Sequence, residues 1–497
     1  MTPLFTTRRF VTVLTATILT TYALIATGAA MTTTRAASSC STWPFCGGLE
    51  VLSGEFFLIV GHRLLSVVAG VLVLLTLAMA WRTETSWHIR AAVTAGFVAF
   101  PIQVGVGALV VLTSVPYATQ LHLGIATFIF VALLLSLGWA LEGTTRDSRT
   151  VRSVAGQPAN SPRVSEQAST RQSKAAEPGQ PPANEPGQPP ANEIRRQPAS
   201  TEHSLLEAIQ SRVQAYLELT KPRLMWLLCL LALAGIALAA TTGTWPSGVT
   251  IVATLAGGVL AIGASGTFNH AFERDRDQRM ARTADRPVAT AQIPIRRALL
   301  FGVALLCLSM VVLLTLVNTL AAALTLIAVA YYSVLYTVVL KPNTSWNIAL
   351  GGGAGALPAV IGWVAVTGSI GLPALVLALL VVIWTPAHFY NLAIVYREDY
   401  ARGGYPMFPV VAGVAAARRR VLLTLGATLL TAATLTLVSP LGWLFTVAIV
   451  LAGSLFLASA VTQCRVRTDR ATMRTFYTSN AYLGVVLLAI VAEALLI

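Results

Sequence analysis

Residues 269–287 read NHAFERDRDQRMARTADRP, and this polar stretch follows directly on a long apolar run. Asn269, Glu273 and Asp277 are spaced four apart, so on a continuing helix their side chains lie on one face. Carboxylates crowded in this way repel each other unless a divalent cation lies between them, and Mg²⁺ accepts one or two carboxylates together with the phosphate oxygens of a substrate. Asp275 lies off this face but within reach if the helix ends there. The stretch therefore predicts a cation-assisted phosphate site at the end of an apolar helix.

The composition of the chain excludes a soluble globular protein. The chain has 497 residues, of which 55% are hydrophobic and 11% charged, and its mean hydropathy is +0.71. A soluble domain typically has about 25% charged residues. Apolar runs of about 18 to 25 residues recur along the chain, the length a helix needs to cross a bilayer. About four precede residue 145 and about nine follow residue 222, so we expect an all-α polytopic membrane protein with about 13 transmembrane helices, a four-helix bundle plus a nine-helix module.

The segment between these two groups of runs is rich in Pro, Gln, Ser and Arg. It contains the sequence EPGQPPAN twice in tandem, from Glu177 to Asn192. A stretch of this composition cannot bury a core, so we expect a disordered linker. The predicted division is a four-helix module at 1–142, a linker at 143–214 and a nine-helix module at 215–497.

The chain has a net charge of +14. The position of its basic residues matters more than this total, because basic loops of membrane proteins stay in the cytoplasm. With Arg8 and Arg9 inside, about thirteen crossings place most basic loops inside, and the predicted outer loops contain only Arg35. This predicts a multi-pass plasma-membrane protein. A secretory signal is the alternative for the first run, which its length disfavours. Basic residues scattered at helix ends indicate a lipid bilayer as partner and no nucleic acid.

A second acidic cluster follows the apolar run near 373–392. Glu398 and Asp399 stand beside Arg397, and crossing parity places them on the same cytoplasmic side as the first cluster. Each cluster alone is typical of an ordinary charged loop at a membrane surface. Two clusters on one side, each next to a long apolar helix, favour a site for a diphosphate with an apolar tail.

These motifs resemble the UbiA superfamily of intramembrane prenyltransferases and, within it, the protohaem IX farnesyltransferases (haem O synthases). The resemblance covers about 280 residues, from Tyr216 to the C-terminus. It rests on the N-x₃-E-R-D-x-D stretch within 269–287, on GGGAGALPAVIGW at 351–363, and on the segment 388–410.

The resemblance implies roles for particular residues. The first metal-diphosphate motif would comprise Asn269, Glu273, Asp275 and Asp277, and the second, looser motif Glu398 and Asp399. Mg²⁺ would bind to Glu273, Asp277 and Asp399, although the second-motif ligand is open. The implied diphosphate contacts are Lys221, Arg223, Arg274, Arg282, Arg286 and Arg397, several of which are equally well interpreted as interface anchors.

The implied reaction transfers the farnesyl group of farnesyl diphosphate to a vinyl group of haem B, and water completes the hydroxyethylfarnesyl substituent of haem O. His388 matches the family pattern HF and is either a haem contact or a polar packing residue. The rings of Tyr331, Tyr332, Tyr336, Phe389 and Tyr390 either shield an allyl cation or pack helices. The alternative acceptors are a quinone precursor and a glycerol lipid.

In the N-terminal module, His62 and His122 lie at similar depths in parallel-running helices, an arrangement that can hold haem iron. A hydrogen-bonded packing role is the alternative. With CSTWPFCGG, QVGVGALVVLT and QLHLG, the module resembles one half of the haem A synthases. It departs from that family in having a single half, and Ile59 stands where a Glu is frequent. It is expected to bind haem, with or without catalysis, and to associate with a haem A synthase or a terminal oxidase assembly.

Cysteines add one expectation. Cys40 and Cys46 share the first predicted outer loop, outside the reducing cytosol, so a disulfide or a transient redox pair is plausible there.

Overall fold

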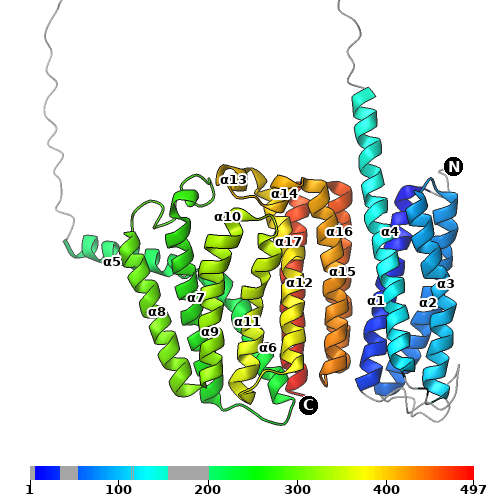
Figure 1. Cartoon of the computed structure of the whole chain (residues 1–497), viewed down its shortest axis with the longest axis horizontal. Coiled ribbons are helices and arrows are strands. Elements are labelled where there is room, and N and C mark those ends of the chain that lie inside the picture. Colours follow the sequence, from blue (N-terminus) through cyan, green and yellow to red (C-terminus); the bar gives the residue numbers. More distant parts are fainter. Residues whose placement is uncertain (1–5, 34–53, 114, 116, 155–200, 497) are drawn as a thin grey trace, which may run out of the picture. The chain divides into compact units, whose positions relative to one another are not determined.

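The computed structural model describes residues 6–33, 54–113, 115, 117–154 and 201–496, and within these ranges it contains helices and no strands. Thirteen of the helices are long and apolar enough to cross a membrane (Figure 1). The all-α class and the expected number of crossings are therefore confirmed, and the chain is a multi-pass membrane protein. Cys40 and Cys46 lie outside the described residues.

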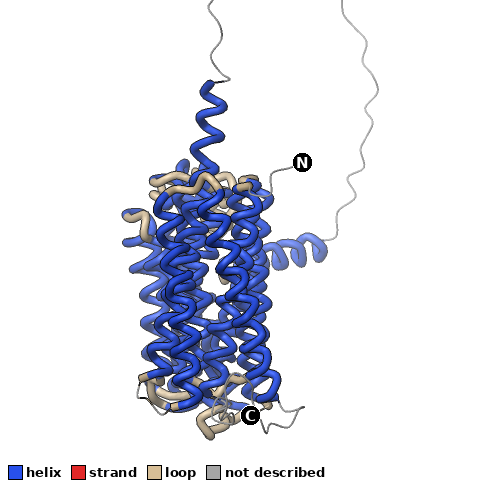
Figure 2. The backbone as a smooth tube through the Cα atoms, turned by 90° about the vertical axis from the view of Figure 1, so that its right-hand side faces the viewer, coloured by secondary structure: helices blue, strands red, loops and turns tan. Residues whose placement is uncertain are grey.

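Four membrane helices precede the linker: α1 (Thr7–Thr33), α2 (Gly54–Arg82), α3 (Trp87–Leu112) and α4 (Ala118–Val154). After the linker the chain forms α5 (Thr201–Leu219), α6 (Pro222–Ala240), α7 (Gly248–Asp277), α8 (Ile295–Leu316), α9 (Thr319–Ala330), the π-helix η2 (Tyr331–Leu340), α10 (Lys341–Asn343), α11 (Asn347–Thr367), α12 (Leu372–Val395), α13 (Arg397–Arg402), α14 (Phe408–Val411), α15 (Val414–Val438), α16 (Trp443–Val466) and α17 (Asp469–Ala494). The long helices run side by side (Figure 2).

The predicted linker at 143–214 is helical at both of its ends. The structure continues α4 to Val154 and begins α5 at Thr201, and residues 155–200 lie outside the described ranges. No Pro or Gly interrupts residues 144–154, whereas the Pro-rich sequence begins beyond them. Thr145–Val213 form a unit separate from the one that contains Met1–Thr144 and Gln214–Ile497.

The N-terminal helices contact the C-terminal helices α15 and α16 within one unit. The hydroxyl of Tyr22 on α1 donates to the carbonyl of Ile449 on α16 at 3.3 Å. Nη1 of Arg419 on α15 lies 3.3 Å from Oε1 of Glu142 on α4. A buried tyrosine hydroxyl with a backbone partner avoids the cost of an unpaired polar group in an apolar environment. The two predicted membrane modules therefore share a packed interface.

A close helix crossing joins α6 to α11 through two glycines. A Cβ on Gly235 would lie 2.2 Å from the carbonyl oxygen of Ala359, and one on Gly362 would lie 2.0 Å from that of Ala232. Small residues allow backbones in a membrane to approach closely and gain van der Waals contact, because burial of apolar surface provides little drive there.

Replacing Gly362 by Ala is expected to force α6 and α11 apart and to lower stability by about 1–3 kcal/mol, the usual cost of overpacking. Gly355→Ala is the matched control, because it lies on the same helix with nothing within 4 Å of an added Cβ. Thermal unfolding in detergent measures both variants. A Gly362→Ala protein as stable as the control would contradict the close crossing.

Candidate functional site

Helix α7 presents Asn269, Glu273 and Asp277 on one buried face. Their exposed fractions are 2%, 3% and 1%. Because α7 continues through Asp277, the four-residue spacing places all three side chains on one face, as the sequence predicts. Asp275 lies on the exposed side of the same turn. The first motif is thus divided into three inward groups and one outward carboxylate.

Two cations neutralise the buried carboxylates. Nη1 of Arg286 lies 2.8 Å from Oδ2 of Asp277 and 3.9 Å from Oε2 of Glu273. Nζ of Lys341 lies 2.5 Å from Oε1 of Glu273. The other Asp277 oxygen, Oδ1, is buried and has no hydrogen-bond partner in the part of the chain that the structure describes. An unpaired buried carboxylate oxygen is costly, so this atom is available to a further cation.

Lys221 reaches the same cluster from the start of α6. Its backbone is left-handed, with φ 55°, and Pro222 fixes the first position of the helix. Its ammonium donates to Oδ1 of Asn269 and, at 3.4 Å, to the hydroxyl of Tyr332. Burial, followed by the positive charge of Arg286, lowers the pKa of Lys221 to about 7. A strained backbone that holds a half-buried amine among charged groups is typical of a functional position.

The acids of the second cluster have different surroundings. Asp399 is buried and accepts hydrogen bonds from the backbone N–H of Ala281 at 2.7 Å and of Arg282 at 3.2 Å, and from Nη2 of Arg402 at 2.7 Å. Burial acts to raise the pKa of Asp399, but the bond from Arg402 and the two backbone bonds hold it below its ordinary value. The Glu398 side chain is 78% exposed and pairs with Arg397 at 3.2 Å. Asp399 therefore ties the loop after α7 to α13.

Tyr405 completes the site between two cations. Its ring centroid lies 4.5 Å from Nζ of Lys341 and 4.9 Å from Cζ of Arg276, and the side chain is buried. Burial, then the nearby charge of Glu273, raises the pKa of Tyr405, so it stays a neutral hydroxyl. Sequence reasoning missed Lys341 and Tyr405 as site residues, although crossing parity alone places Lys341 at the correct end of its helix.

The other predicted diphosphate contacts lie away from the two carboxylates. Arg282 stacks over the rings of Tyr396 and Tyr400, at 4.9 and 5.6 Å from their centroids. Arg397 bonds Glu398 and lies 3.9 Å from Asp469. Arg223 is exposed and Arg274 is half-buried. Of the six predicted cations, only Lys221 and Arg286 contact the buried face of α7 in the described structure.

His388 lies in an aromatic stack between α12 and α17. Its ring centroid is 4.3 Å from those of Trp384 and Phe476, and its Nδ1 is 2.6 Å from Oγ of Ser479. These contacts are compatible with the polar packing role, and the haem contact that the sequence also allows stays a prediction.

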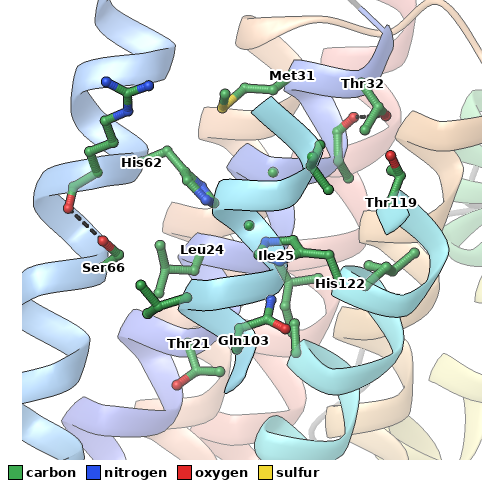
Figure 3. Close-up of a pocket in the computed structure, with 18 of the residues that line it drawn as sticks. Thr21, Leu24, Ile25, Met31, Thr32, His62, Ser66, Gln103, Thr119 and His122 are labelled. Carbon is green, nitrogen blue, oxygen red and sulfur yellow. Dashed lines mark hydrogen bonds between the residues drawn. The ribbon is translucent and has the colours of Figure 1, made fainter. Parts of the chain in front are cut away.

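The N-terminal module contains a pocket of about 190 Å³ that both of its predicted histidines line. Figure 3 shows the imidazoles of His62 on α2 and His122 on α4 pointing into this space. Nδ1 of His62 is 3.0 Å from the Thr27 hydroxyl. Gly107 leaves room for the second ring, since a Cβ there would lie 2.8 Å from Cε1 of His122. Leu437 of α15 also lines the pocket, so the C-terminal part contributes to its wall.

Charged groups at one end of a helical bundle, next to apolar helices, suit a substrate with an ionic head and an apolar tail. Residues 228–484 match the model of the UbiA prenyltransferase family. The fold and the site thus define an intramembrane prenyltransferase, and the chain is an enzyme of this class.

Comparison with whole proteins narrows the class. The chain is 48% identical over 490 residues to "Protoheme IX farnesyltransferase 2" of Natronomonas pharaonis, covering 99% of this chain and 100% of that protein. It is 44% identical over 283 residues to "Protoheme IX farnesyltransferase 1" of Saccharopolyspora erythraea, covering 56% of this chain and 89% of that protein. A solved structure of digeranylgeranylglyceryl phosphate synthase in membranes aligns at 15% identity with TM-score 0.49, covering 58% of this chain and 100% of that chain. The chain belongs to the protoheme IX farnesyltransferase family.

The lowered pKa of Lys221 predicts pH-dependent binding of an anion. Above about pH 7 the free amine predominates, and an anion favours the charged form, so the affinity for inorganic diphosphate is expected to fall about tenfold between roughly pH 6 and pH 8. Lys221→Arg keeps its charge throughout and is the matched control, which removes the titration of diphosphate itself from the comparison. Calorimetry measures how the affinity for diphosphate changes with pH in each protein. An equal change in both would contradict the assignment of this pH dependence to Lys221.

Proposed function

We propose that the enzyme transfers the farnesyl group of farnesyl diphosphate to a vinyl group of protohaem IX (haem B) and so makes haem O. The observation that carries the proposal is the pair of buried carboxylates, Glu273 and Asp277, matched by Arg286 and Lys341 at the end of an apolar bundle. An ionic head would lie among these groups and an isoprenoid tail among the helices. The names of the relatives supply the prenyl donor and the acceptor.

The residues present fit a Mg²⁺ ion bound together with the substrate. The unpaired Oδ1 of Asp277 is the supporting observation, and we propose Asp277 and Glu273 as ligands, with Asn269 beside them. Mg²⁺ takes its remaining ligands from phosphate and water, and when bound it neutralises charge on the leaving diphosphate. Asp399 was expected as a third ligand; its oxygens are engaged by the loop at 281–282, and we assign it the role of positioning that loop.

Three cationic side chains of the protein are proposed to bind the diphosphate directly. Arg286 and Lys341 are held in place by the carboxylates and Lys221 by Asn269. All three can turn part of their hydrogen-bonding capacity to the diphosphate oxygens. Pre-placed donors stabilise charge that develops on a leaving group without reorganisation at the moment of reaction. Arg274 and Asp275 are proposed to act at the rim, where the substrate enters.

The proposed acceptor is haem rather than a quinone precursor or a glycerol lipid. Support comes from the full-length relatives and from the histidine pocket in the same chain. His388 would shape the neighbouring α12–α17 interface. We propose that the protein lies in the plasma membrane with the acidic clusters at the cytoplasmic face, since the basic loops follow that parity.

Purified full-length protein, incubated with farnesyl diphosphate, Mg²⁺ and haem B, is expected to give haem O, identified by mass. Glu273→Gln and Asp277→Asn each remove a buried charge from the site, and each is expected to lower turnover at least about a hundredfold while the protein still inserts into membranes. Asp285→Asn is the control, an exposed carboxylate in the same loop.

Full activity in either buried variant would remove the metal-diphosphate assignment. Diphosphate release that leaves haem B unchanged but prenylates an added quinone precursor or glycerol lipid would favour the alternative acceptors.

We further propose that residues 1–142 form a haem-binding module and 215–497 the prenyltransferase, with the linker between them. The family model matches residues 228–484, which lie within the proposed prenyltransferase, and this supports the second boundary. The shared pocket of His62 and His122 supports the first. Such a module would bind haem or serve as a redox subunit, and would dock to a haem A synthase or a terminal oxidase assembly.

Full-length protein loaded with haem is expected to show a bis-imidazole absorption spectrum that His62→Ala or His122→Ala abolishes, because each removes one of two axial ligands. His88→Ala, an exposed histidine of the same module, is the control. An unchanged spectrum in both pocket variants would contradict the haem assignment without affecting the prenyltransferase.

A further inference from the structure

The membrane span Thr319–Asn343 contains a ten-residue π-helix, η2. π-Helical geometry mostly occurs as a single turn and is frequent at functional sites. Here a side-chain hydrogen bond follows the same i→i−5 pattern, since the hydroxyl of Thr337 donates to the carbonyl of Tyr332 at 2.8 Å. A distortion of this length requires a compensating gain.

The gain is a register in which two polar side chains reach α7 while two tyrosines reach Lys221 and α11. Residues five apart share a face of a π-helix, which aligns Tyr332 with Thr337 and Tyr336 with Lys341. In an α-helix, residues five apart point about 140° away from each other. Thr337 accepts from Nδ2 of Asn269 at 3.1 Å, and Lys341 binds a carboxylate of the cluster. An α-helix would turn each tyrosine away from the polar side chain five residues later, so the two tyrosines could not share a face with Thr337 and Lys341.

The two tyrosines form one aromatic surface beside the cluster. Their ring centroids lie 5.6 Å apart with an interplanar angle of 29°, and Tyr332 accepts from Lys221. Gly351 on α11 provides the space for Tyr336, since a Cβ there would lie 2.5 Å from Cδ2 of the ring. The other three aromatic candidates have partners of their own. Phe389 meets His388 edge-on, Tyr390 packs against Phe408, and the hydroxyl of Tyr331 donates to the carbonyl of Leu350.

We propose that the Tyr332–Tyr336 stack stabilises the allylic cation of the substrate and that η2 exists to place this stack beside the diphosphate site. The inference rests on the proposed function. The allylic C–O bond breaks, and both electrons leave with the diphosphate oxygen. The electron-rich ring faces stabilise the positive charge on carbon. The vinyl π electrons of the acceptor then form the new C–C bond, and water adds to the resulting cation and releases a proton.

The first test compares two substitutions at Tyr336 in the full-length enzyme with Mg²⁺, farnesyl diphosphate and haem B. Tyr336→Phe keeps the ring face and Tyr336→Leu removes it. Loss of a desolvated cation–π contact predicts a kcat about 30-fold lower for the Leu variant than for the Phe variant. The KM for farnesyl diphosphate is expected to differ by less than about twofold, because the contact is made in the transition state.

Equal kcat values for the two variants would overturn the proposal. A wild-type enzyme that makes no prenylated haem would instead overturn the proposed function, so the two failures are distinguishable.

The second test uses the glycine that faces the ring. Gly351→Ala is expected to displace Tyr336 and lower kcat, whereas Gly355→Ala, one turn further along α11 with open space around it, leaves kcat unchanged. In the Tyr336→Leu background, Gly351→Ala is expected to cost nothing further, because the displaced ring is already gone. An equal loss in both backgrounds would show that the glycine acts independently of the ring and would overturn its assigned role.

Discussion

The site depends on the burial of two carboxylates, Glu273 and Asp277, one helical turn apart at the end of α7. Each would be costly to bury alone, and together they repel. Arg286 and Lys341 offset this cost, but they come from the loop after α7 and from the start of α10. That loop is held by Asp399, whose carboxylate accepts hydrogen bonds from two backbone N–H groups. Folding of this end therefore requires α7, α10 and α13 to meet, and the proposed active site is also a structural junction.

The electrostatic balance of this junction explains how it can accept an anion. Two carboxylates face Lys221, Arg286 and Lys341, so the cluster has an excess positive charge when Lys221 is protonated and is nearly neutral when it is not. The pKa of Lys221, lowered to about 7, places the group at that boundary. A magnesium complex of an isoprenoid diphosphate is still an anion, and it would stabilise the protonated lysine. Substrate binding and protonation of Lys221 are thus linked.

Much of this arrangement was predictable from the sequence, and what was missed shares a physical cause. Membrane spans follow from apolar length, and the common face of Asn269, Glu273 and Asp277 follows from helical spacing. The partners Lys341 and Tyr405 arrive from distant segments, and only tertiary packing brings them to α7. The role of Asp399 depends on backbone N–H groups, which are present at every non-proline residue and leave no sequence signal. The π-helix was unpredictable for a related reason, because its register is favoured by contacts with α7 and α11.

Helix α15 relates the two proposed modules to each other. Near its start, the guanidinium of Arg420 lies over the rings of Trp346 and Phe408, close to the loops that carry the acidic site. Near its end, Leu437 lines the histidine pocket. Seventeen residues of helix separate them, or about 25 Å along the axis. A haem passing between the sites would have to cross most of a bilayer. We therefore interpret α15 as a wall that the two modules share and not as a route for haem between them. Joining the modules then fixes their contact and their stoichiometry, and packing of α1 and α4 against α15 and α16 stabilises each module through the other.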